Sequence, residues 1–370
     1  DFMKKHVFYF GMLMCLLAAL TGCKKKEEVQ EIPTETQTEI VMEEPETETQ
    51  IETHEGEMRS FYTGAWIDDK LGYNRPVAVM TENTHVTLPQ YGLSHADVIY
   101  ECPVEGGITR LMTIYQDFAD LEKVGNVRSC RLYYVYFAKE FGAVYFHAGE
   151  SKYALDVLNS SFIDNVDGIT GKGGAFYYRD NSRKAPHNLY TTGANLVSAI
   201  EKYGYENTLS QDYEPHYQFT TEDAPNLLEN GVDAAAVKMY YVDAKPWFLY
   251  NEEDGLYYRY EFGEKQVDGE TGDQLAVKNI IIQNCYSSLK DSNNGTLDID
   301  YLSGGTGKYI TNGKAIDITW SRASSTDKTR YYDMDGKEIV LNPGKTWVEI
   351  SENSRSGNNI IYSTKEEFQK

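Results

Sequence analysis

The residues that could do chemistry gather between positions 101 and 188, where arginines and histidines stand close to glycine and proline. The candidate acid–base residues are Glu105, His147 and His187. The candidate ligand-binding residues are Glu101, Arg110, Arg128, Arg131, Arg179, Arg183 and Asn188. Arginine forks match carboxylate and phosphate groups, and binding groups often lie on loops and at strand ends. This pattern therefore predicts a cleft for an anion or a glycan-phosphate.

The same arginines could instead form structural ion pairs. Acidic residues stand near them in the sequence, namely Glu101, Glu105, Glu150 and Asp180. Histidine is the side chain that most readily changes charge near neutral pH, but a hydrogen-bonded structural histidine is as common as a catalytic one. Both interpretations of the segment stay open at this point.

The elements that must position these residues lie between 61 and 220. Strands are predicted over 75–80, 97–101, 108–115 and 143–147, and helices over 132–141, 153–158 and 193–203. Short strands separated by Gly- and Asn-rich turns follow over 234–352. The sequence therefore predicts an α+β fold: an N-terminal mixed α/β sandwich domain over 61–220 that carries the candidate site, and an all-β antiparallel C-terminal domain over 234–352.

Several familiar catalytic patterns do not occur in the chain. There is no H-E-x-x-H, no G-x-S-x-G, and no strand followed by G-x-G-x-x-G. No Cys or His cluster has the spacing of a zinc site. The run 304–308 ends like a phosphate-binding loop, but Tyr309 replaces the required Ser or Thr, which indicates a turn. We therefore expect no metal and no cofactor.

Composition narrows the class of partner. The chain has 370 residues, 35 Lys and Arg against 57 Asp and Glu, and a formal net charge of −22. Binding to nucleic acid requires a basic surface that neutralises phosphates, so we expect no nucleic-acid partner.

Residues 1–23 have the pattern of a bacterial lipoprotein signal peptide. Two lysines precede an uncharged run over 7–20, which is too short for a comfortable membrane span. The run Leu20-Thr21-Gly22-Cys23 resembles a lipobox, in which Cys23 is diacylated before cleavage. The alternative is a secretion signal with a chance cysteine. Two acyl chains anchor a protein firmly, so the predicted partner is the membrane and the predicted location is its extracytoplasmic face.

Residues 24–60 are predicted to form a disordered acidic tether. Twelve glutamates lie between Glu27 and Glu57, and acidic tracts that repel themselves stay extended. Such a tether would hold the folded part away from the lipid.

The remaining cysteines are odd in number. They are Cys102, Cys130 and Cys285, so a complete disulfide framework is excluded. Buried free thiols are expected, and a Cys102–Cys130 disulfide is the alternative.

The motifs around the candidate site resemble the YerB-type lipoproteins of Gram-positive bacteria, a family named for a domain of unknown function. The resembling runs are Arg75–Met80, Tyr91–Glu101, Pro103–Arg110, Gly125–Ser129 and Lys184–Tyr190, with Leu341–Trp347 in the C-terminal part. The resemblance implies an envelope lipoprotein with two domains, and it supplies no established activity.

Three functions remain compatible with these observations. The predicted one is a binding or regulatory lipoprotein that recognises a wall polymer, a glycan-phosphate or an envelope protein. The second is an enzyme on an anionic envelope substrate, since Arg110 and Arg128–Arg131 are similar, over a short stretch, to strand-end arginines of LytR–CpsA–Psr phosphotransferases. The third is a solute-binding lipoprotein with a small ligand between its domains.

Overall fold

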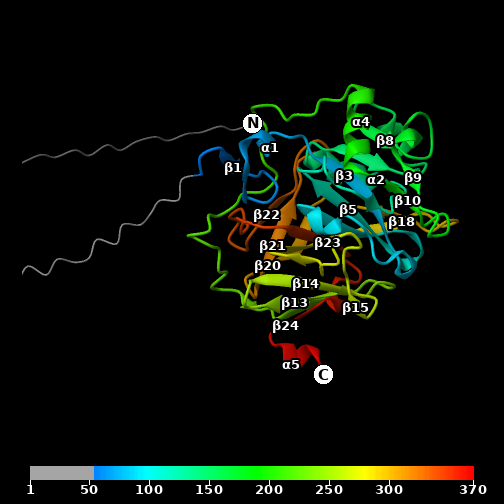
Figure 1. The fold of residues 1–370 in the computed structure, drawn as a ribbon. Helices are drawn as coiled ribbons and strands as arrows, with labels where there is room; N and C mark the ends of the chain where they lie inside the picture. The colour runs from blue at the N-terminus through cyan, green and yellow to red at the C-terminus, as the bar shows by residue number, and fades with distance from the viewer. Residues whose placement is uncertain (1–53) are drawn as a thin grey trace, which may run out of the picture. The chain divides into compact units, whose positions relative to one another are not determined.

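Residues 54–370 are described in the computed structural model, and their largest sheet is a mixed sheet of eleven strands (Figure 1). Its strand order is β11-β21-β20-β17-β23-β4-β5-β3-β7-β8, with β22 paired to β21. The strands are β3 (Val77–Asn83), β4 (Val98–Pro103), β5 (Thr109–Tyr115), β7 (Val144–His147), β8 (Asn165–Asp167), β11 (Val232–Asp233), β17 (Asn279–Cys285), β20 (Gly305–Thr311), β21 (Lys314–Ser321), β22 (Arg330–Tyr332) and β23 (Thr346–Glu352).

Strands from both ends of the described chain share this sheet. β4 and β23 pair in parallel, with Val98 opposite Thr346. β23 also runs parallel to β17, while β17, β20, β21 and β22 pair antiparallel. β3, β7 and β8 form a second parallel set. The described part of the chain therefore consists mostly of strands in mixed and antiparallel sheets, with few helices. The predicted α+β class is confirmed.

A second sheet of six strands and three small sheets complete the strand set. The six strands are β12 (Ala236–Lys238), β13 (Trp247–Asn251), β14 (Leu256–Glu261), β15 (Glu264–Lys265), β16 (Ala276–Val277) and β24 (Ile360–Tyr362). The small sheets contain β1 (Glu57–Arg59) with β2 (Trp66–Asp68), β6 (Val124–Gly125) with β10 (Leu189–Thr191) and β9 (Tyr178–Arg179), and β18 (Ser287–Asp291) with β19 (Thr296–Ile299).

Two helices are long enough to cover a sheet. The helices are α1 (Asp69–Gly72), α2 (Leu132–Glu140), α3 (Leu155–Leu158), α4 (Gly193–Tyr203) and α5 (Lys365–Phe368). α4 begins after Thr192, whose side chain accepts a hydrogen bond from the backbone N–H of Asn195 at 3.1 Å, and it ends at Gly204 in the left-handed conformation. These local caps explain why its bounds agree with the predicted ones.

The large sheet separates two apolar cores. One contains Tyr134 and Phe137 of α2, and the other contains Leu196 of α4 together with Phe248 of the six-stranded sheet. Successive residues of a strand face opposite sides. In β4, Tyr100 and Cys102 therefore belong to the core on the α2 face, whereas Ile99 belongs to the other core.

Candidate anion-binding site

Three of the five predicted arginines, Arg110, Arg128 and Arg131, come together at one end of the strands β3 and β5 in the large sheet. Arg110 of β5 lies opposite Glu82 of β3, close to where β3 and its parallel neighbour β7 end. The segment before α2 passes over these strand ends, where the backbone N–H of Arg128 donates to the carbonyl of Met80 at 3.0 Å. Arg131 then occupies the N-cap of α2. Ligands often bind beyond the carboxyl ends of parallel strands, so this placement suits a binding site.

Arg110 is the most buried member of the cluster, with 5% of its surface exposed. Its Nη1 donates to the carbonyl of Ser129 at 2.7 Å, and its Nε is buried without a hydrogen-bond partner. Burial, followed by repulsion from Arg131 and Arg128, lowers the pKa of Arg110 to about 10. A bound anion would relieve this repulsion, since an opposite charge favours the charged form of a group.

Arg131 has a carboxylate partner. Its Nε donates to Glu105 Oε1 at 2.6 Å, and its Nη1 donates to the carbonyl of Cys130 at 2.8 Å. Burial opposes ionisation of Glu105, but the bond and charge of Arg131 outweigh burial and hold the pKa of Glu105 below its ordinary value. Glu105 is therefore ionised at neutral pH, and it can act as a base but not as an acid.

The three guanidinium groups keep unused donors. Within residues 54–370, no hydrogen bond uses the Nη2 atom of Arg110, Arg128 or Arg131. Buried polar atoms without a partner include the Nε atoms of Arg110 and Arg128 but none of these Nη2 atoms. The Nη2 groups therefore reach solvent and can donate to a ligand.

Glu82 is a residue of this site that the sequence analysis missed. Both of its carboxylate oxygens contact His187 Nδ1, at 2.9 and 3.0 Å. Its Oε2 also accepts from Asn126 Nδ2 at 3.2 Å and lies 3.4 Å from Arg128 Nε. The strand that carries Glu82 was predicted to end at position 80, two residues earlier. The position of Glu82 just beyond a predicted strand end was the available signal.

The other predicted ligand-binding residues on the segment 179–188 hold local structure. Arg179 Nη1 donates to Asn188 Oδ1 at 2.8 Å, and Asn188 Nδ2 donates to the carbonyls of Asp180 and Arg183, both at 3.2 Å. Arg183 donates to the carbonyls of Thr87, Leu88 and Pro89. From this segment His187 joins the arginine cluster through Glu82, and the carbonyl of Pro186 accepts a hydrogen bond from Arg128 Nη1 at 3.3 Å.

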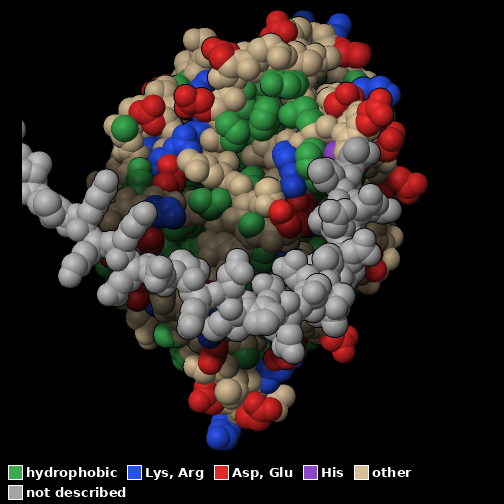
Figure 2. Space-filling view, turned by 90° about the vertical axis from the view of Figure 1, so that its left-hand side faces the viewer, with side chains coloured by type: hydrophobic (Ala, Val, Ile, Leu, Met, Phe, Trp, Pro, Cys, Tyr) green, Lys and Arg blue, Asp and Glu red, His purple; other side chains and the backbone are tan. Residues whose placement is uncertain are grey.

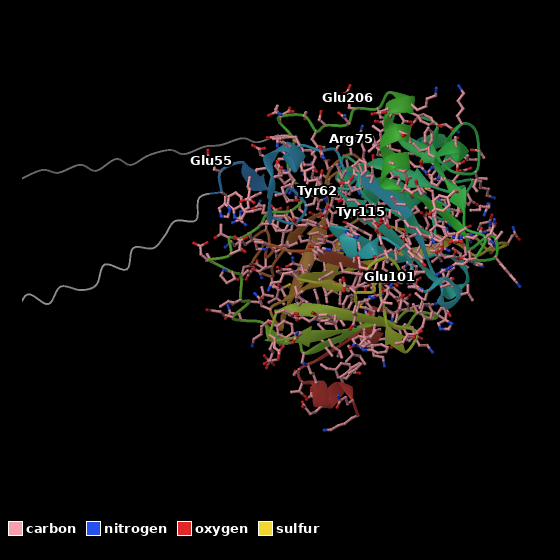
Figure 3. The ribbon with its side chains drawn as sticks, in the orientation of Figure 1. Glu55, Tyr62, Arg75, Glu101, Tyr115 and Glu206 are labelled. Atoms are coloured by element: carbon pink, nitrogen blue, oxygen red, sulfur yellow. The ribbon has the colours of Figure 1, made fainter. Side chains whose placement is uncertain are left out.

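Glu101, labelled in Figure 3, is fully buried and lies on the opposite side of the sheet from Arg110. Its Oε1 accepts from Thr109 Oγ1 at 2.6 Å, and its Oε2 pairs with the buried Arg259 of β14. Strand alternation explains the separation, because Glu101 shares its face with Ile99 and Arg110 shares its face with Cys102. The structure thus gives Glu101 a partner in the core rather than a place in the arginine cluster.

His147 is also separate from the arginines. It is 1% exposed at the end of β7, where Nδ1 lies 2.9 Å from the carbonyl of Gly149 and Nε2 lies 3.2 Å from Asn165 Oδ1. Its acidic neighbours are Glu150 and Asp167. The connection to the cluster is indirect, through the backbone bond from Cys130 N–H to the Gly149 carbonyl at 2.9 Å.

Two cavities of the described chain differ in their relation to the candidate site: one borders the segment that contains Glu105, and the other is lined by none of the predicted site residues. One of about 230 Å³ is bordered by the 3₁₀ helix η3 (Glu105–Gly107) and is lined by Val104, Thr109, Tyr241, Val242 and Leu297, among others. A larger one, of about 690 Å³, is lined by Phe61, Tyr217, Phe219, Arg59, Arg330 and Glu338, among others. Figure 2 shows the side of the molecule on which β1 and β22 lie, where hydrophobic side chains gather among charged ones.

The three cysteines of the described part are free and buried. Burial raises the pKa of the Cys130 thiol to about 12, so this thiol is unreactive at neutral pH. No disulfide joins Cys102 and Cys130 among residues 54–370. Cys23 lies outside residues 54–370, and none of the helices in that described range is long and apolar enough to cross a membrane.

Comparison with known proteins places the fold and the motifs in a family. Residues 62–206 match the "Protein of unknown function (DUF3048) N-terminal domain", and residues 236–348 match its C-terminal domain. The chain is 34% identical over 289 residues to "Putative lipoprotein YerB" of Bacillus subtilis (strain 168), which covers 78% of this chain and 84% of that protein.

A solved structure agrees with the sequence match. The crystal structure of YerB protein from Bacillus subtilis superposes with a TM-score of 0.70 at 31% sequence identity, covering 79% of this chain and 96% of that one. The resemblance that the motifs predicted is confirmed.

Proposed function

Because the chain belongs to the DUF3048 family of YerB-like proteins, we propose that it is a lipid-anchored protein of the extracytoplasmic membrane face that binds an anionic component of the envelope. The binding groups are Arg110, Arg128 and Arg131. The ligand class is a phosphate-bearing wall polymer or glycan-phosphate. The lipobox-like run that ends at Cys23 and the name of the relative support the anchor.

The observation that carries the binding proposal is the environment of Arg110. A buried guanidinium that pairs with no carboxylate of residues 54–370 stands beside two further guanidinium groups, although the whole chain carries a net charge of −22. An acidic protein repels anions in general, so a local attractive field must come from a cluster of this kind. Glu105 and Glu82 orient Arg131 and Arg128 and leave the Nη2 donors free.

Replacing Arg128 with alanine is expected to weaken binding of a poly(glycerol phosphate) chain by about tenfold or more, since a hydrogen bond to a charged group is worth about 1.5–3 kcal/mol. Isothermal titration of the purified full chain measures this. Lys308→Ala is the matched control, because it also removes one positive charge, from an exposed pair with Asp317. Equal affinity for wild type and Arg128→Ala, with loss in Lys308→Ala, would place the binding surface elsewhere.

The anchor has its own expected result. Cys23→Ala should release the protein from membranes or leave it unprocessed, because the acylated thiol is lost. Fractionation of cells followed by immunoblotting measures this. Cys15→Ala, which changes a cysteine inside the predicted signal, should leave the protein in the membrane fraction. A Cys23→Ala protein that fractionates and migrates like wild type contradicts the anchor.

A second candidate function is favoured by the Glu82–His187 pair. His187 is 34% exposed at its side chain and contacts a carboxylate that is 3% exposed, which is how a general base is commonly oriented. An enzyme acting on the same phosphate esters would use His187 for proton transfer and the arginines for the developing charge. His187→Gln would then abolish release of polymer fragments while binding persists, and absence of release by wild type rejects this candidate.

A further inference from the structure

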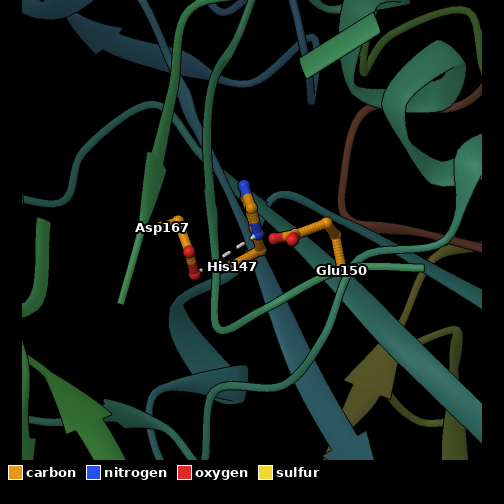
Figure 4. A group of neighbouring side chains, drawn as sticks. All are labelled: His147, Glu150 and Asp167. Atoms are coloured by element: carbon orange, nitrogen blue, oxygen red, sulfur yellow. Dashed lines mark ion pairs between the residues drawn. The ribbon is translucent and has the colours of Figure 1, made fainter. Parts of the chain in front are cut away.

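The parallel pairing of β7 and β8 places His147 directly beside Asp167, at the ends of both strands. The turn at Gly149 returns Glu150 toward them, and one ligand atom from each of the three side chains lies within 4.8 Å of the others. Figure 4 shows the Glu150 carboxylate directed at the imidazole and the ion pair between His147 and Asp167. We propose that His147, Glu150 and Asp167 bind a divalent transition-metal ion such as Zn²⁺ or Mn²⁺.

The hydrogen bonds of Asn165 fix which nitrogen of His147 carries a proton. Asn165 Nδ2 donates to the carbonyls of Leu158 and Ile163, at 2.8 and 3.3 Å. Its Oδ1 therefore faces His147 Nε2, 3.2 Å away. A side-chain amide oxygen only accepts hydrogen bonds, so Nε2 bears the hydrogen. In a neutral imidazole the lone pair is then on Nδ1.

Three oxygen acceptors surround that lone pair in the described part of the chain. Nδ1 lies 2.9 Å from the carbonyl of Gly149 and 3.9 Å from Asp167 Oδ1, with the Glu150 carboxylate as the third neighbour. A lone pair packed among acceptors at a site that is 1% exposed is unfavourable unless a positive charge, from a proton or from a metal ion, lies between them. A metal ion at Nδ1 supplies that charge, and a histidine ligand that donates its other N–H to an oxygen is the usual arrangement.

The carboxylates of Asp167 and Glu150 would contribute to metal binding in different ways. Asp167 is held in place, since its Oδ1 accepts from the N–H groups of Gly149 and Ile169 at 2.6 and 3.0 Å. The side chain of Glu150 takes part in no hydrogen bond within residues 54–370, so it can turn toward an ion.

The lengths of metal–ligand bonds allow the ion to fit after a small movement of the Glu150 side chain. Three atoms separated by 4.8 Å or less leave a point that lies within about 2.8 Å of each, and rotation of Glu150 shortens this toward the ~2.0–2.2 Å of zinc–nitrogen and zinc–oxygen bonds. One nitrogen and two carboxylate ligands match Zn²⁺ and Mn²⁺ better than softer or purely hard ions. Three protein ligands also leave a coordination position open for water.

This proposal goes beyond the anion-binding function and stands on different residues. Its three ligands are not among Arg110, Arg128 and Arg131, so either site can fail without the other. Sequence spacing did not indicate the ion site, because the three residues are brought together by strand pairing rather than by a helical or Cys-x-x-Cys repeat.

The test uses the purified full chain, stripped with EDTA and dialysed, and titrated calorimetrically with ZnCl₂ and with MnCl₂. We expect one equivalent of at least one ion to bind and to raise the melting temperature through linkage. Glu150→Gln should weaken binding by about tenfold or more, since even outer residues of metal sites contribute that much. Glu201→Gln removes an equivalent exposed charge from α4 and should bind like wild type.

A second measurement distinguishes a metal from a proton. In nitrogen-15 spectra of histidine-labelled protein, addition of Zn²⁺ should shift Nδ1 of His147 while Nε2 keeps its hydrogen. The proposal is overturned if wild type takes up neither ion, or if Glu150→Gln binds as tightly as wild type. It is also overturned if Nδ1 of His147 stays protonated at neutral pH in excess Zn²⁺ and Mn²⁺.

Discussion

Replacing Arg259 with leucine is expected to lower the free energy of unfolding by about 3–5 kcal/mol, the usual cost of removing one partner from a buried ion pair. Arg259 is 0% exposed between the two large sheets. Its Nη1 donates to Glu349 at 2.6 Å, and its Nη2 pairs with Glu101. A third carboxylate, Glu261, lies 3.9 Å from Nη2. Leucine would leave these three acidic groups in the core without a cation.

Stacking adds to the expected loss. The guanidinium carbon lies 4.2 Å from the centre of the Trp347 ring and 4.7 Å from that of Phe248, and cation–π contacts of desolvated groups are worth up to about 2 kcal/mol. Urea unfolding followed by circular dichroism measures the change. Arg355→Leu is the control, because its pair with Glu352 is partly exposed and exposed pairs contribute about 0–1 kcal/mol. An equally small decrease in the free energy of unfolding in both variants would contradict the proposed role of Arg259 in this core.

The same core predicts that the protein is more stable at pH 5 than at pH 8. Burial raises the pKa of Glu261 and of Glu349, and in Glu349 the charge of Glu101 adds to this. Burial also raises the pKa of Asp97 to about 6 and raises that of Glu140. A carboxyl group whose pKa is raised in the folded state stabilises the fold below its unfolded pKa. That contribution is lost as pH rises through the folded value.

Glu261→Gln should flatten this pH dependence and raise the free energy of unfolding at pH 8 by about 1.4 kcal/mol, the equivalent of a tenfold change in proton affinity. Glu261 is the informative position because neither of its oxygens has a hydrogen-bond partner, whereas Glu101 and Glu349 bond Arg259. Urea unfolding between pH 5 and pH 8 measures the slope. Glu201→Gln on the exposed face of α4 should leave it unchanged, and a variant slope equal to that of wild type would contradict the assignment.

Local signals allowed part of the fold to be predicted from the sequence. α4 was expected over 193–203 and has those bounds, because its start and end depend on Thr192 and Gly204. The strand β17 carries three consecutive isoleucines that are buried on both faces of the sheet, and such a continuous apolar run is typical of a fully buried strand. The parallel pairing of β4 with β23 joins residues about 250 positions apart, and no local pattern indicates such a pair.

The candidate site, like the fold, could be predicted from the sequence only in part. The grouping of Arg110, Arg128 and Arg131 followed from their positions near strand and helix ends, and the structure brings them together. The core position of Glu101 depends on Arg259, which lies 158 residues later. Alternation along β4 and β5 was the signal that could have separated Glu101 from Arg110. Glu82 was missed because the strand that carries it was expected to end at Met80.

The most direct test of the anion-binding account is a crystal structure of the protein with a short glycerol phosphate oligomer. The account predicts a phosphate within about 3.2 Å of the Nη2 atoms of at least two of Arg110, Arg128 and Arg131, with Glu105 still paired to Arg131 and Glu82 still paired to Arg128. An oligomer bound only at another surface, while these three arginines keep their present contacts, would contradict it.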